Sequence, residues 1–460
     1  MERTSLYLHA GQVYVLRITH YVFQKVHVDP QTYELTLTTL TYGGDALGRL
    51  DDSRAVFVPF GLPGERVRVR LTEEKRGFAR GEIVEILQSA PERIVPKCKH
   101  FFSLTPTPLP EGEGQRVRGF CGGCHYQHLP YEMQLKVKAD ILRDQLTRIG
   151  KIQNPPVKPM VASPNEWNYR NHMQFHLTED GKLGFVSPLP DLGQGRRGEG
   201  IIPITECHLP EASINAFWPQ IEFEPDTNIE RVSIRAGMDD ELMLVLESDS
   251  PETPAIDIEA GVSVSHVFED HAIVIAGDDH IIIKVLDRGF HVSAASFFQV
   301  NTAMAGKMIE HLLNRLPIPQ SAIFDVYCGV GLFSAFLAPK CKQLIGIESS
   351  ASACEDFAIN LDEFDNVELY EDLAENVLPA LKVKPDIILV DPPRAGLEKQ
   401  ALDAIVKLNS KTIAYVSCDP STLARDAARL IQNGYQLTDV TPFDLFPQTY
   451  HIESISLFEK

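Results

Sequence analysis

Cys418, followed by Asp-Pro, is a candidate nucleophile at the end of an apolar strand. Residues 413–416 are short, apolar and flanked by polar residues, and Pro420 suits the first turn of a helix. Cys418 is therefore expected at the carboxyl edge of an α/β sheet, where such sheets bind ligands. A thiolate there suits covalent catalysis. For an isolated cysteine, a buried structural thiol is the alternative.

Three other predicted strands end in residues that suit a cofactor. Residues 322–327 lead into CGVG, whose glycines allow close approach of the backbone to a ligand. Glu348 ends the next strand, where a carboxylate can bind ribose hydroxyls. The third glycine of the dinucleotide fingerprint is missing, which favours S-adenosylmethionine over a nicotinamide cofactor. Asp391 precedes two prolines at the end of a further strand.

Four cysteines form a second candidate site, and the first 300 residues contain no others: Cys98, Cys121, Cys124 and Cys207. A Cys-x2-Cys pair with two further cysteines can hold tetrahedral zinc or an iron–sulfur cluster. His100, His125 and His128 leave a zinc site with histidine ligands open. Because this site precedes the catalytic half, we expect it to staple the region together.

Length and composition limit the class of protein. A chain of 460 residues has room for two to four domains, and its net charge of −20 argues against an indiscriminate polyanion binder. No run of 18 apolar residues predicts a membrane span. The uneven cysteine usage and the absence of a signal-peptide pattern predict a cytoplasmic protein. Alternating arginines at residues 66–70 indicate either a solvated sheet face or an RNA contact.

The elements that position these residues differ along the chain. Residues 33–91 show short alternating strands and turns, typical of a small closed barrel. Residues 131–149 have helical apolar spacing, and residues 167–298 alternate strands with turns. Arg170 and Asn171 are candidate RNA contacts in that region. Two Pro-Leu-Pro segments, at residues 104–119 and 186–200, lack apolar periodicity and are expected to be exposed insertions.

Five motifs carry a resemblance to a known family: SFFQVN (residues 296–301), FDVYCGVG, DPPRAGL, SCDPSTLARD and the terminal HIESISLFEK. In this order they resemble the RNA uracil-5-methyltransferase family, specifically its 23S ribosomal RNA type with a TRAM domain and a four-cysteine cluster. The barrel is similar to the TRAM domain, an OB-like fold, which implies RNA binding.

The resemblance implies a multidomain α/β protein. We expect an N-terminal extension at residues 1–32 and a TRAM barrel at 33–91. A central mixed α+β domain with the iron–sulfur cluster is expected at 92–300. The C-terminal domain, at 301–460, is expected to be a Rossmann-like methyltransferase that uses S-adenosylmethionine. The chain is expected to act as a monomer on RNA, without a membrane partner.

The resemblance also assigns roles to residues. Cys418 is implied as nucleophile and Glu453 as general base. The implied cofactor residues are Gln299, Tyr327, Glu348, Asp372 and Asp391. The implied ligands of a [4Fe–4S] cluster are Cys98, Cys121, Cys124 and Cys207.

The implied chemistry requires these residue types, because carbon 5 of uracil is a poor nucleophile until a thiolate adds at carbon 6. A base must then remove the carbon 5 proton. One alternative is the same reaction on transfer RNA. Asp-Pro-Pro also suggests an amino-group methyltransferase, although Arg394 follows where an aromatic residue is usual. A non-catalytic RNA-binding assembly factor is the third alternative, against which the presence of both Cys418 and Glu453 argues.

Overall fold

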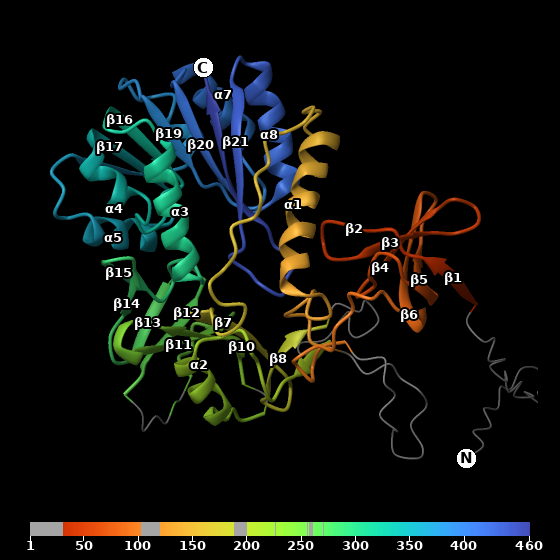
Figure 1. The fold of residues 1–460 in the computed structure, drawn as a ribbon. Helices are drawn as coiled ribbons and strands as arrows, with labels where there is room; N and C mark the ends of the chain where they lie inside the picture. The colour runs from red at the N-terminus through yellow and green to blue at the C-terminus, as the bar shows by residue number, and fades with distance from the viewer. Residues whose placement is uncertain are drawn as a thin grey trace, which may run out of the picture.

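The computed structural model describes residues 31–102, 120–187, 200–225, 227–254, 256, 261–269 and 271–460. Three large sheets and a two-stranded hairpin follow one another along this part of the chain (Figure 1). The predicted extension, except its last two residues, and most of both predicted insertions lie outside the described residues. Among the described helices, none combines the length and the apolar character that crossing a membrane requires.

The N-terminal sheet has six strands in the order β1-β5-β6-β4-β3-β2 and stands to one side of the molecule (Figure 1). Its alternating apolar residues, such as Leu35, Val56 and Val67, share one buried core. The strands are β1 (Thr32–Thr36), β2 (Thr39–Leu40), β3 (Ala46–Arg49), β4 (Ala55–Val58), β5 (Arg66–Glu74) and β6 (Phe78–Gln88).

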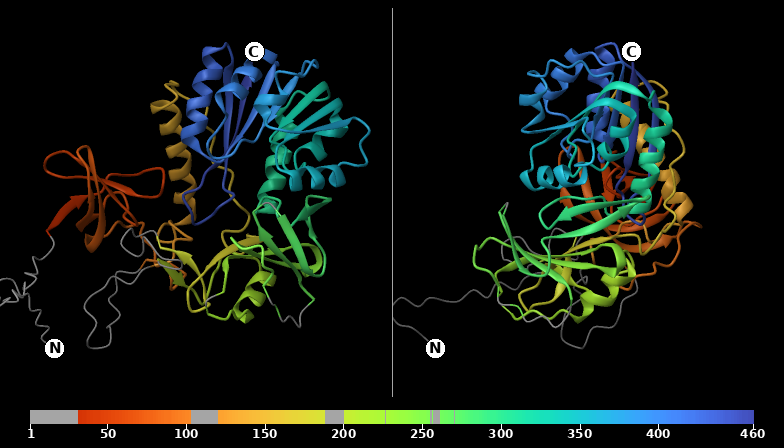
Figure 2. Two further views of the ribbon diagram at one scale, coloured as in Figure 1. Left: turned by 180° about the vertical axis from the view of Figure 1, so that it is seen from behind. Right: turned by 90° about the vertical axis from the view of Figure 1, so that its left-hand side faces the viewer.

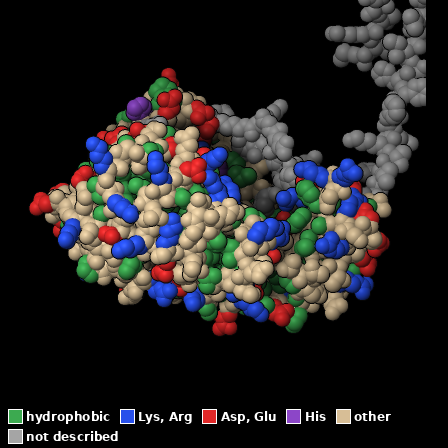
Figure 3. Space-filling model, turned by 90° about the horizontal axis from the view of Figure 1, so that it is seen from above, with side chains coloured by type: hydrophobic (Ala, Val, Ile, Leu, Met, Phe, Trp, Pro, Cys, Tyr) green, Lys and Arg blue, Asp and Glu red, His purple; other side chains and the backbone are tan. Residues whose placement is uncertain are grey.

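The three alternating arginines lie on one side of β5, and each pairs with a glutamate. Arg66 and Arg68 both pair with Glu34, and Arg68 also pairs with Glu85. Arg70 pairs with Glu82. This pairing favours a solvated sheet face. Viewed from above, basic and acidic side chains are interspersed over the barrel and the larger body beside it (Figure 3).

The central sheet has seven strands in the order β13-β12-β11-β10-β7-β8-β9. Its apolar face, including Phe175, Val232 and Leu244, packs with Ile214 of α2 (Ala212–Phe217). Its strands are β7 (His172–Leu177), β8 (Leu183–Val186), β9 (Ile201–Pro203), β10 (Ile229–Ala236), β11 (Leu242–Ser248), β12 (Ser263–Phe268) and β13 (His271–Ala276). Two 3-10 turns flank them, η1 (Trp218–Gln220) and η2 (Met238–Asp240).

The C-terminal sheet has seven strands in the order β18-β17-β16-β19-β20-β22-β21. The first five are parallel, and β22 runs antiparallel to β20. Every residue of β20 is buried, as expected of a strand covered on both faces. The strands are β16 (Gln320–Val326), β17 (Cys341–Glu348), β18 (Val367–Glu371), β19 (Ile387–Val390), β20 (Thr412–Ser417), β21 (Gln436–Phe443) and β22 (Glu453–Glu459).

Helices cover both faces of this sheet (Figure 2). Ile323 faces a core shared with α3 (Thr302–Arg315), α4 (Ser334–Leu337) and α5 (Ala351–Asn360). The next residue, Phe324, faces the opposite core, because side chains alternate along a strand. That second core is shared with α1 (Tyr131–Arg148), α6 (Ala374–Val377), α7 (Lys399–Leu408) and α8 (Pro420–Gln432). The short η3 (Ala338–Lys340) precedes β17.

The predicted central region, residues 92–300, divides between two packing units. α1 packs against the C-terminal sheet through Ile141 and Leu142. Val157 and Val161 bridge to β21 at its edge. The hairpin of β14 (His280–Val285) and β15 (Arg288–Ser293) joins the core under α3. These segments carry apolar faces that the C-terminal sheet buries, so spatial domains do not follow chain order here.

Candidate active site and cysteine cavity

The carboxyl edge of the C-terminal sheet gathers most of the predicted site residues. Cys418 follows β20, Asp391 follows β19, Glu348 ends β17, and Tyr327 follows β16. Because these strands are parallel neighbours, their ends meet at one edge. The strand predictions that placed these four residues are confirmed by the bounds of the strands.

Cys418 and Glu453 meet because β22 lies antiparallel beside β20. The register pairs Ser417 with Ser454, so Cys418 and Glu453, the next residues of the two segments, lie at the same end of the sheet. Burial, followed by the charges of Glu453 and Asp391, raises the pKa of the Cys418 thiol to about 12, and Arg394 opposes this. The nucleophile candidate therefore has a carboxyl group and a guanidinium within electrostatic reach.

Glu453 is buried, with 7% of its surface exposed. Burial raises its pKa well above the usual value, Asp391 adds to the effect, and Arg394 opposes it. Arg394 is thus the cation shared by Cys418 and Glu453. It was not among the predicted site residues, although its position directly after Asp-Pro-Pro at a strand end could have indicated it.

The turn after β16 has the geometry of a ligand-binding loop. Glu348 accepts a hydrogen bond from the backbone N–H of Gly329 at 2.9 Å, which fixes the turn against β17. Gly331 has φ +89°, and an added Cβ would lie 2.3 Å from the side chain of Leu361. Tyr327 also has positive φ, at 65°. Glycine is therefore required at residue 331 for the turn to close.

Carboxyl groups with raised pKa values line the same edge. Asp325 is fully buried, accepts from Ser334 Oγ at 2.6 Å, and leaves its Oδ1 without a partner. Burial raises the pKa of Asp325 to about 7, and burial with the charges of Asp325 and Glu348 raises that of Asp391 to about 7. Carboxyl groups held so close together favour a cationic ligand. A sulfonium and an ammonium group, as in S-adenosylmethionine, fit this set.

The other predicted cofactor residues lie around this edge. Gln299 is half-buried, and its backbone carbonyl accepts from Asn171 Nδ2 at 3.1 Å. Burial, then Glu375, raises the pKa of Tyr327 to about 12. Asp372 is exposed after β18, where its Oδ1 accepts from the backbone N–H of Leu373 at 2.7 Å. No side-chain hydrogen bond joins Gln299 or Asp372 to the other site residues in the described part of the chain.

The segment before Glu453 is held by buried polar contacts from α1. Lys138 Nζ donates to Asp444 Oδ1 at 2.6 Å, and both side chains are fully buried. Gln134 exchanges hydrogen bonds with Gln448, which has φ 70°. α1 therefore sets the path of the chain that leads into Glu453.

Replacing Asp444 with Asn should destabilise the protein by about 3–5 kcal/mol, because it leaves the Lys138 cation buried without a counter-charge. Chemical denaturation with circular dichroism measures the change. The matched control is Asp140→Asn on α1, the helix that carries Lys138. The exposed Asp140–Arg143 pair should contribute less than about 1 kcal/mol to stability. Equal losses in both variants would show that the buried pair has no special weight.

Tyr42 of the barrel reaches the residue next to Cys418. Tyr42 OH donates to Asp419 Oδ2 at 2.9 Å, and Asp419 Oδ1 caps α8 by accepting from the N–H groups of Ser421 and Thr422. The ring of Tyr42 also meets that of Tyr450 edge-on at 5.8 Å. The residue next to Cys418 is thus fixed from two sides. Nothing in the sequence pattern indicated this contact.

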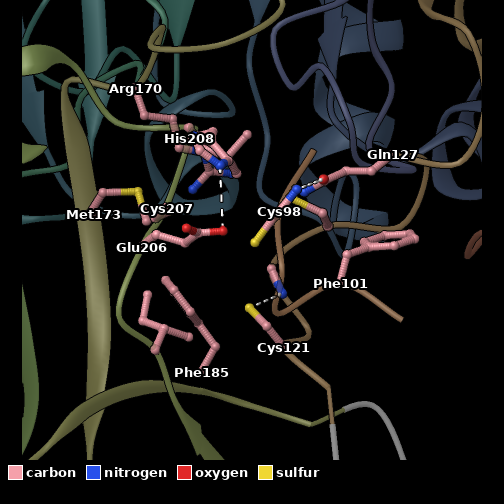
Figure 4. A pocket seen from close by; sticks show the side chains of 14 residues that line it. Cys98, Phe101, Cys121, Gln127, Arg170, Met173, Phe185, Glu206, Cys207 and His208 are labelled. Atoms are coloured by element: carbon pink, nitrogen blue, oxygen red, sulfur yellow. Dashed lines mark hydrogen bonds and ion pairs between the residues drawn. The ribbon is translucent and has the colours of Figure 1, made fainter. Parts of the chain in front are cut away.

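The four predicted cluster cysteines line one cavity (Figure 4). All four are free thiols, and burial raises the pKa of each, to about 12 for Cys121 and about 11 for Cys207. Cys98 and Cys121 come from one wall, and Cys207 comes from the wall opposite (Figure 4). Four thiols that converge in a half-buried cavity form a donor set for a metal centre.

The three histidines considered from the sequence lie outside the cavity, whereas His208 lines it next to Cys207 (Figure 4). His100 bonds with Thr205, His125 packs on Tyr450, and His128 packs on Phe101. Within the described residues, no three of the cysteine sulfurs lie within 4.8 Å of one another.

The two candidate RNA contacts in the central region are not free surface groups. Asn171 is buried and bonded to the segment of Gln299. Arg170 lines the cysteine cavity, and its guanidinium lies 5.5 Å from the ring centroid of Phe446. For Asn171 the RNA-contact prediction is wrong, because its amide already fastens the central sheet to the catalytic part.

Comparison with known proteins agrees with this geometry. Residues 274–460 match the model of the tRNA (uracil-5-)-methyltransferase family, and residues 30–84 match the TRAM domain. An uncharacterized RNA methyltransferase of Thermosynechococcus vestitus is 31% identical over 93% of this chain and 97% of its own. Another, from Caldanaerobacter subterraneus, is 32% identical over 94% of this chain and 98% of its own.

A solved structure has the same fold over most of the chain. It is the Pyrococcus abyssi tRNA (uracil-54, C5)-methyltransferase in complex with S-adenosyl-L-homocysteine, with a TM-score of 0.67 and 22% identity. The match covers 93% of this chain and all of the other. Together with the near full-length relatives, these findings show that the protein belongs to the S-adenosylmethionine-dependent RNA uracil-5-methyltransferase family and carries a TRAM domain.

Proposed function

We propose that this protein methylates carbon 5 of a uridine in 23S ribosomal RNA through a covalent bond between Cys418 and the base. We further propose that it acts in the cytoplasm as a monomer. The observation that carries the mechanism is the meeting of Cys418 and Glu453 at the sheet edge, beside Asp391 and Arg394.

The residues account for each step of the reaction. The Cys418 thiolate adds to carbon 6 of uracil, and the ring becomes an enolate whose carbon 5 is nucleophilic. Bound S-adenosylmethionine supplies the electrophilic methyl group. Glu453 then removes the carbon 5 proton, the carbon 5–carbon 6 double bond reforms, and the sulfur leaves as thiolate. The positive charge of Arg394 favours both the thiolate and the ionised Glu453.

The turn of residues 327–331 and the neighbouring carboxyl groups are proposed to hold the cofactor. Glu348 is the candidate residue to bind the ribose hydroxyls of the cofactor, since it ends β17 beside the glycine turn. The proposed cofactor set also includes Gln299, Tyr327, Asp372 and Asp391. The unpartnered oxygen of Asp325 supports a ligand that brings a hydrogen-bond donor or positive charge to this edge.

The cysteine cavity is proposed to hold a [4Fe–4S] cluster through Cys98, Cys121, Cys124 and Cys207. A single tetrahedral zinc with 2.3 Å bonds would bring its sulfurs to about 3.8 Å from one another. That no three of the described sulfurs lie within 4.8 Å of one another supports a cluster in which each cysteine binds a different iron.

Transfer RNA is the second candidate substrate, because both the matching family model and the solved relative are named for transfer RNA. The four-cysteine cavity, as part of the resemblance to the ribosomal type, favours 23S ribosomal RNA. In either case the target base must leave its stack to reach Cys418.

Methylation of defined transcripts separates the two substrates. Purified protein with S-adenosylmethionine labelled in its methyl group should label 23S ribosomal RNA fragments and leave transfer RNA unlabelled. Mapping of 5-methyluridine in RNA from a deletion strain should show one or more positions lost from 23S ribosomal RNA. Loss of a transfer RNA position with intact ribosomal methylation would contradict the ribosomal assignment and leave the chemistry unaffected.

A further inference from the structure

A second cavity lies between the polar face of the central sheet and the start of α5. Its volume is about 590 Å³, within the range of ligand pockets. Side chains of β7, β10 and β11 form one wall, and residues 349–352 form the other. Residues 294–297, which lead to Gln299, line it as well, so the cavity adjoins the active site. In Figure 1, α5 lies on the side of the catalytic domain that faces β14, β15 and the central sheet.

Arg235 brings a buried positive charge to this cavity. The residue is 8% exposed, NH1 donates to the carbonyl of Ser293 at 2.8 Å, and Nε has no partner. It forms no ion pair with any residue that the structure describes, and burial lowers its pKa to about 10. A buried guanidinium nitrogen without a hydrogen-bond partner is costly, so an anion that reaches Arg235 Nε gains from it.

The charges of Glu247 and Asp356 partly offset the effect of burial on the pKa of Arg235, but the carboxylates of both residues are hydrogen-bonded to other groups. Glu247 Oε1 accepts from Gln174 at 2.7 Å and from Ser233 at 3.3 Å, and its Oε2 pairs with Arg231. Asp356, behind the wall, is occupied by His291 and Ser293. Glu269 is exposed to solvent.

A neutral histidine stands beside the arginine. His172 pairs with Arg235 in the register of β7 and β10, and its Nε2 is buried without a partner. Burial lowers its pKa to about 3, and the charge of Arg235 adds to this effect. His172 can therefore donate one uncharged N–H to an anion that Arg235 attracts.

The opposite wall supplies backbone donors at the start of α5, beside the Glu348 carboxylate that accepts from the N–H groups of Ser349 and Ser350. α5 has ten residues, and its first-turn N–H groups at Ala351 and Ser352 have no acceptor within the helix. The helix dipole adds partial positive charge at this end. Ser350 caps the helix, and its own N–H is already bonded to Glu348.

We propose that this cavity binds one backbone phosphate of the RNA strand that carries the target uridine. Arg235, His172 and the first turn of α5 bind the phosphate oxygens. The proposal rests on the RNA methyltransferase function proposed above, and it adds a point where the strand is anchored between the central sheet and the catalytic domain. Phosphate contacts of this kind fix the register of a nucleic acid without reading its sequence.

Replacing Ala351 with Asp tests the proposal without threatening the fold, because a carboxylate in the first helical turn stabilises the helix. The same change at the exposed Ala358, near the other end of α5, is the control for net charge. For Ala351→Asp, RNA affinity should fall about fivefold at 0.1 M salt, which is about the loss expected for one phosphate contact. The affinity of the Ala358→Asp protein should match that of wild type within about twofold.

Salt dependence provides the second readout. For Arg235→Gln, the slope of log K against log salt should decrease in magnitude by about 0.7, the value of one phosphate on a single strand, and Arg235→Lys should restore most of it. Binding of S-adenosylhomocysteine should stay unchanged in all variants.

Two results would overturn the proposal. Unchanged RNA affinity in Ala351→Asp would mean that RNA does not reach the cavity. Weaker S-adenosylhomocysteine binding with normal RNA binding would assign the anion to the cofactor carboxylate. Both results are measured as binding affinities. They can therefore be distinguished from an error in the proposed role of Cys418, which is tested by methyl transfer.

Discussion

An enzyme with glutamine in place of Glu453 should become covalently attached to its RNA and remain attached. In the proposed reaction Glu453 acts only after Cys418 has bonded to carbon 6 and the methyl group is on carbon 5. Glutamine cannot remove the carbon 5 proton, so elimination should stall. The attached RNA should survive denaturing electrophoresis and carry the labelled methyl group. Turnover should fall by about 10²–10⁴, the usual contribution of a general base.

Cys418→Ala should behave differently, because the first bond cannot form. That variant should give neither adduct nor product. Cys341→Ala is its matched control, since Cys341 is a half-buried cysteine at the start of β17, outside the turn proposed to hold the cofactor. Glu459→Gln, at the exposed end of the same strand, is the control for Glu453→Gln. Methylation by the Cys418→Ala protein, or an adduct that maps to Cys328, would show that the nucleophile is wrongly assigned.

Loss of one cavity cysteine should remove the proposed [4Fe–4S] cluster and much of the stability around it. Protein purified without oxygen should be brown, absorb broadly at about 400 nm and contain about four irons per chain. Cys124 is the most buried of the four, so Cys124→Ala should bleach the protein and lower its melting temperature, because ligand binding at such a site contributes to folding.

The control for this experiment is Cys341→Ala, which changes a half-buried cysteine of β17 outside the cavity. That protein should keep its colour and iron content. A colourless wild-type protein with one equivalent of zinc would contradict the cluster, and four irons retained after loss of Cys124 would exclude it as a ligand. Cys207→Ala, on the opposite wall, should reproduce the Cys124 result.

The local pattern of the chain was sufficient to place Cys418, Glu348 and Asp391. Each follows or ends a short apolar segment, and such segments form the buried parallel strands β20, β17 and β19. Parallel strands in one sheet present their carboxyl ends together, so the strand predictions implied a common edge. The helix of residues 131–149 was likewise predicted from its periodicity, and α1 spans Tyr131–Arg148.

Domain membership could not be read in the same way. Periodicity shows that α1 has an apolar stripe, and it does not show which surface buries that stripe. In the structure the stripe lies on the catalytic core, although the neighbouring cysteines belong to the central part. The arginines of β5 illustrate the same limit, since their partners Glu82 and Glu85 lie on the adjacent strand β6.

The sequence by itself determined the strands and the glycine turn, because these depend on residues close together in the chain. The order of its motifs carried the resemblance that named Glu453 and the four cysteines. Tertiary structure alone decided that β22 lies beside β20 and so brings Glu453 to Cys418. It also decided that Arg394 serves both groups, that Tyr42 of the barrel holds Asp419, and that Arg235 faces α5. The physical reason is that such contacts join segments far apart in sequence, and their partners are selected by the packing of whole elements, which no short pattern encodes.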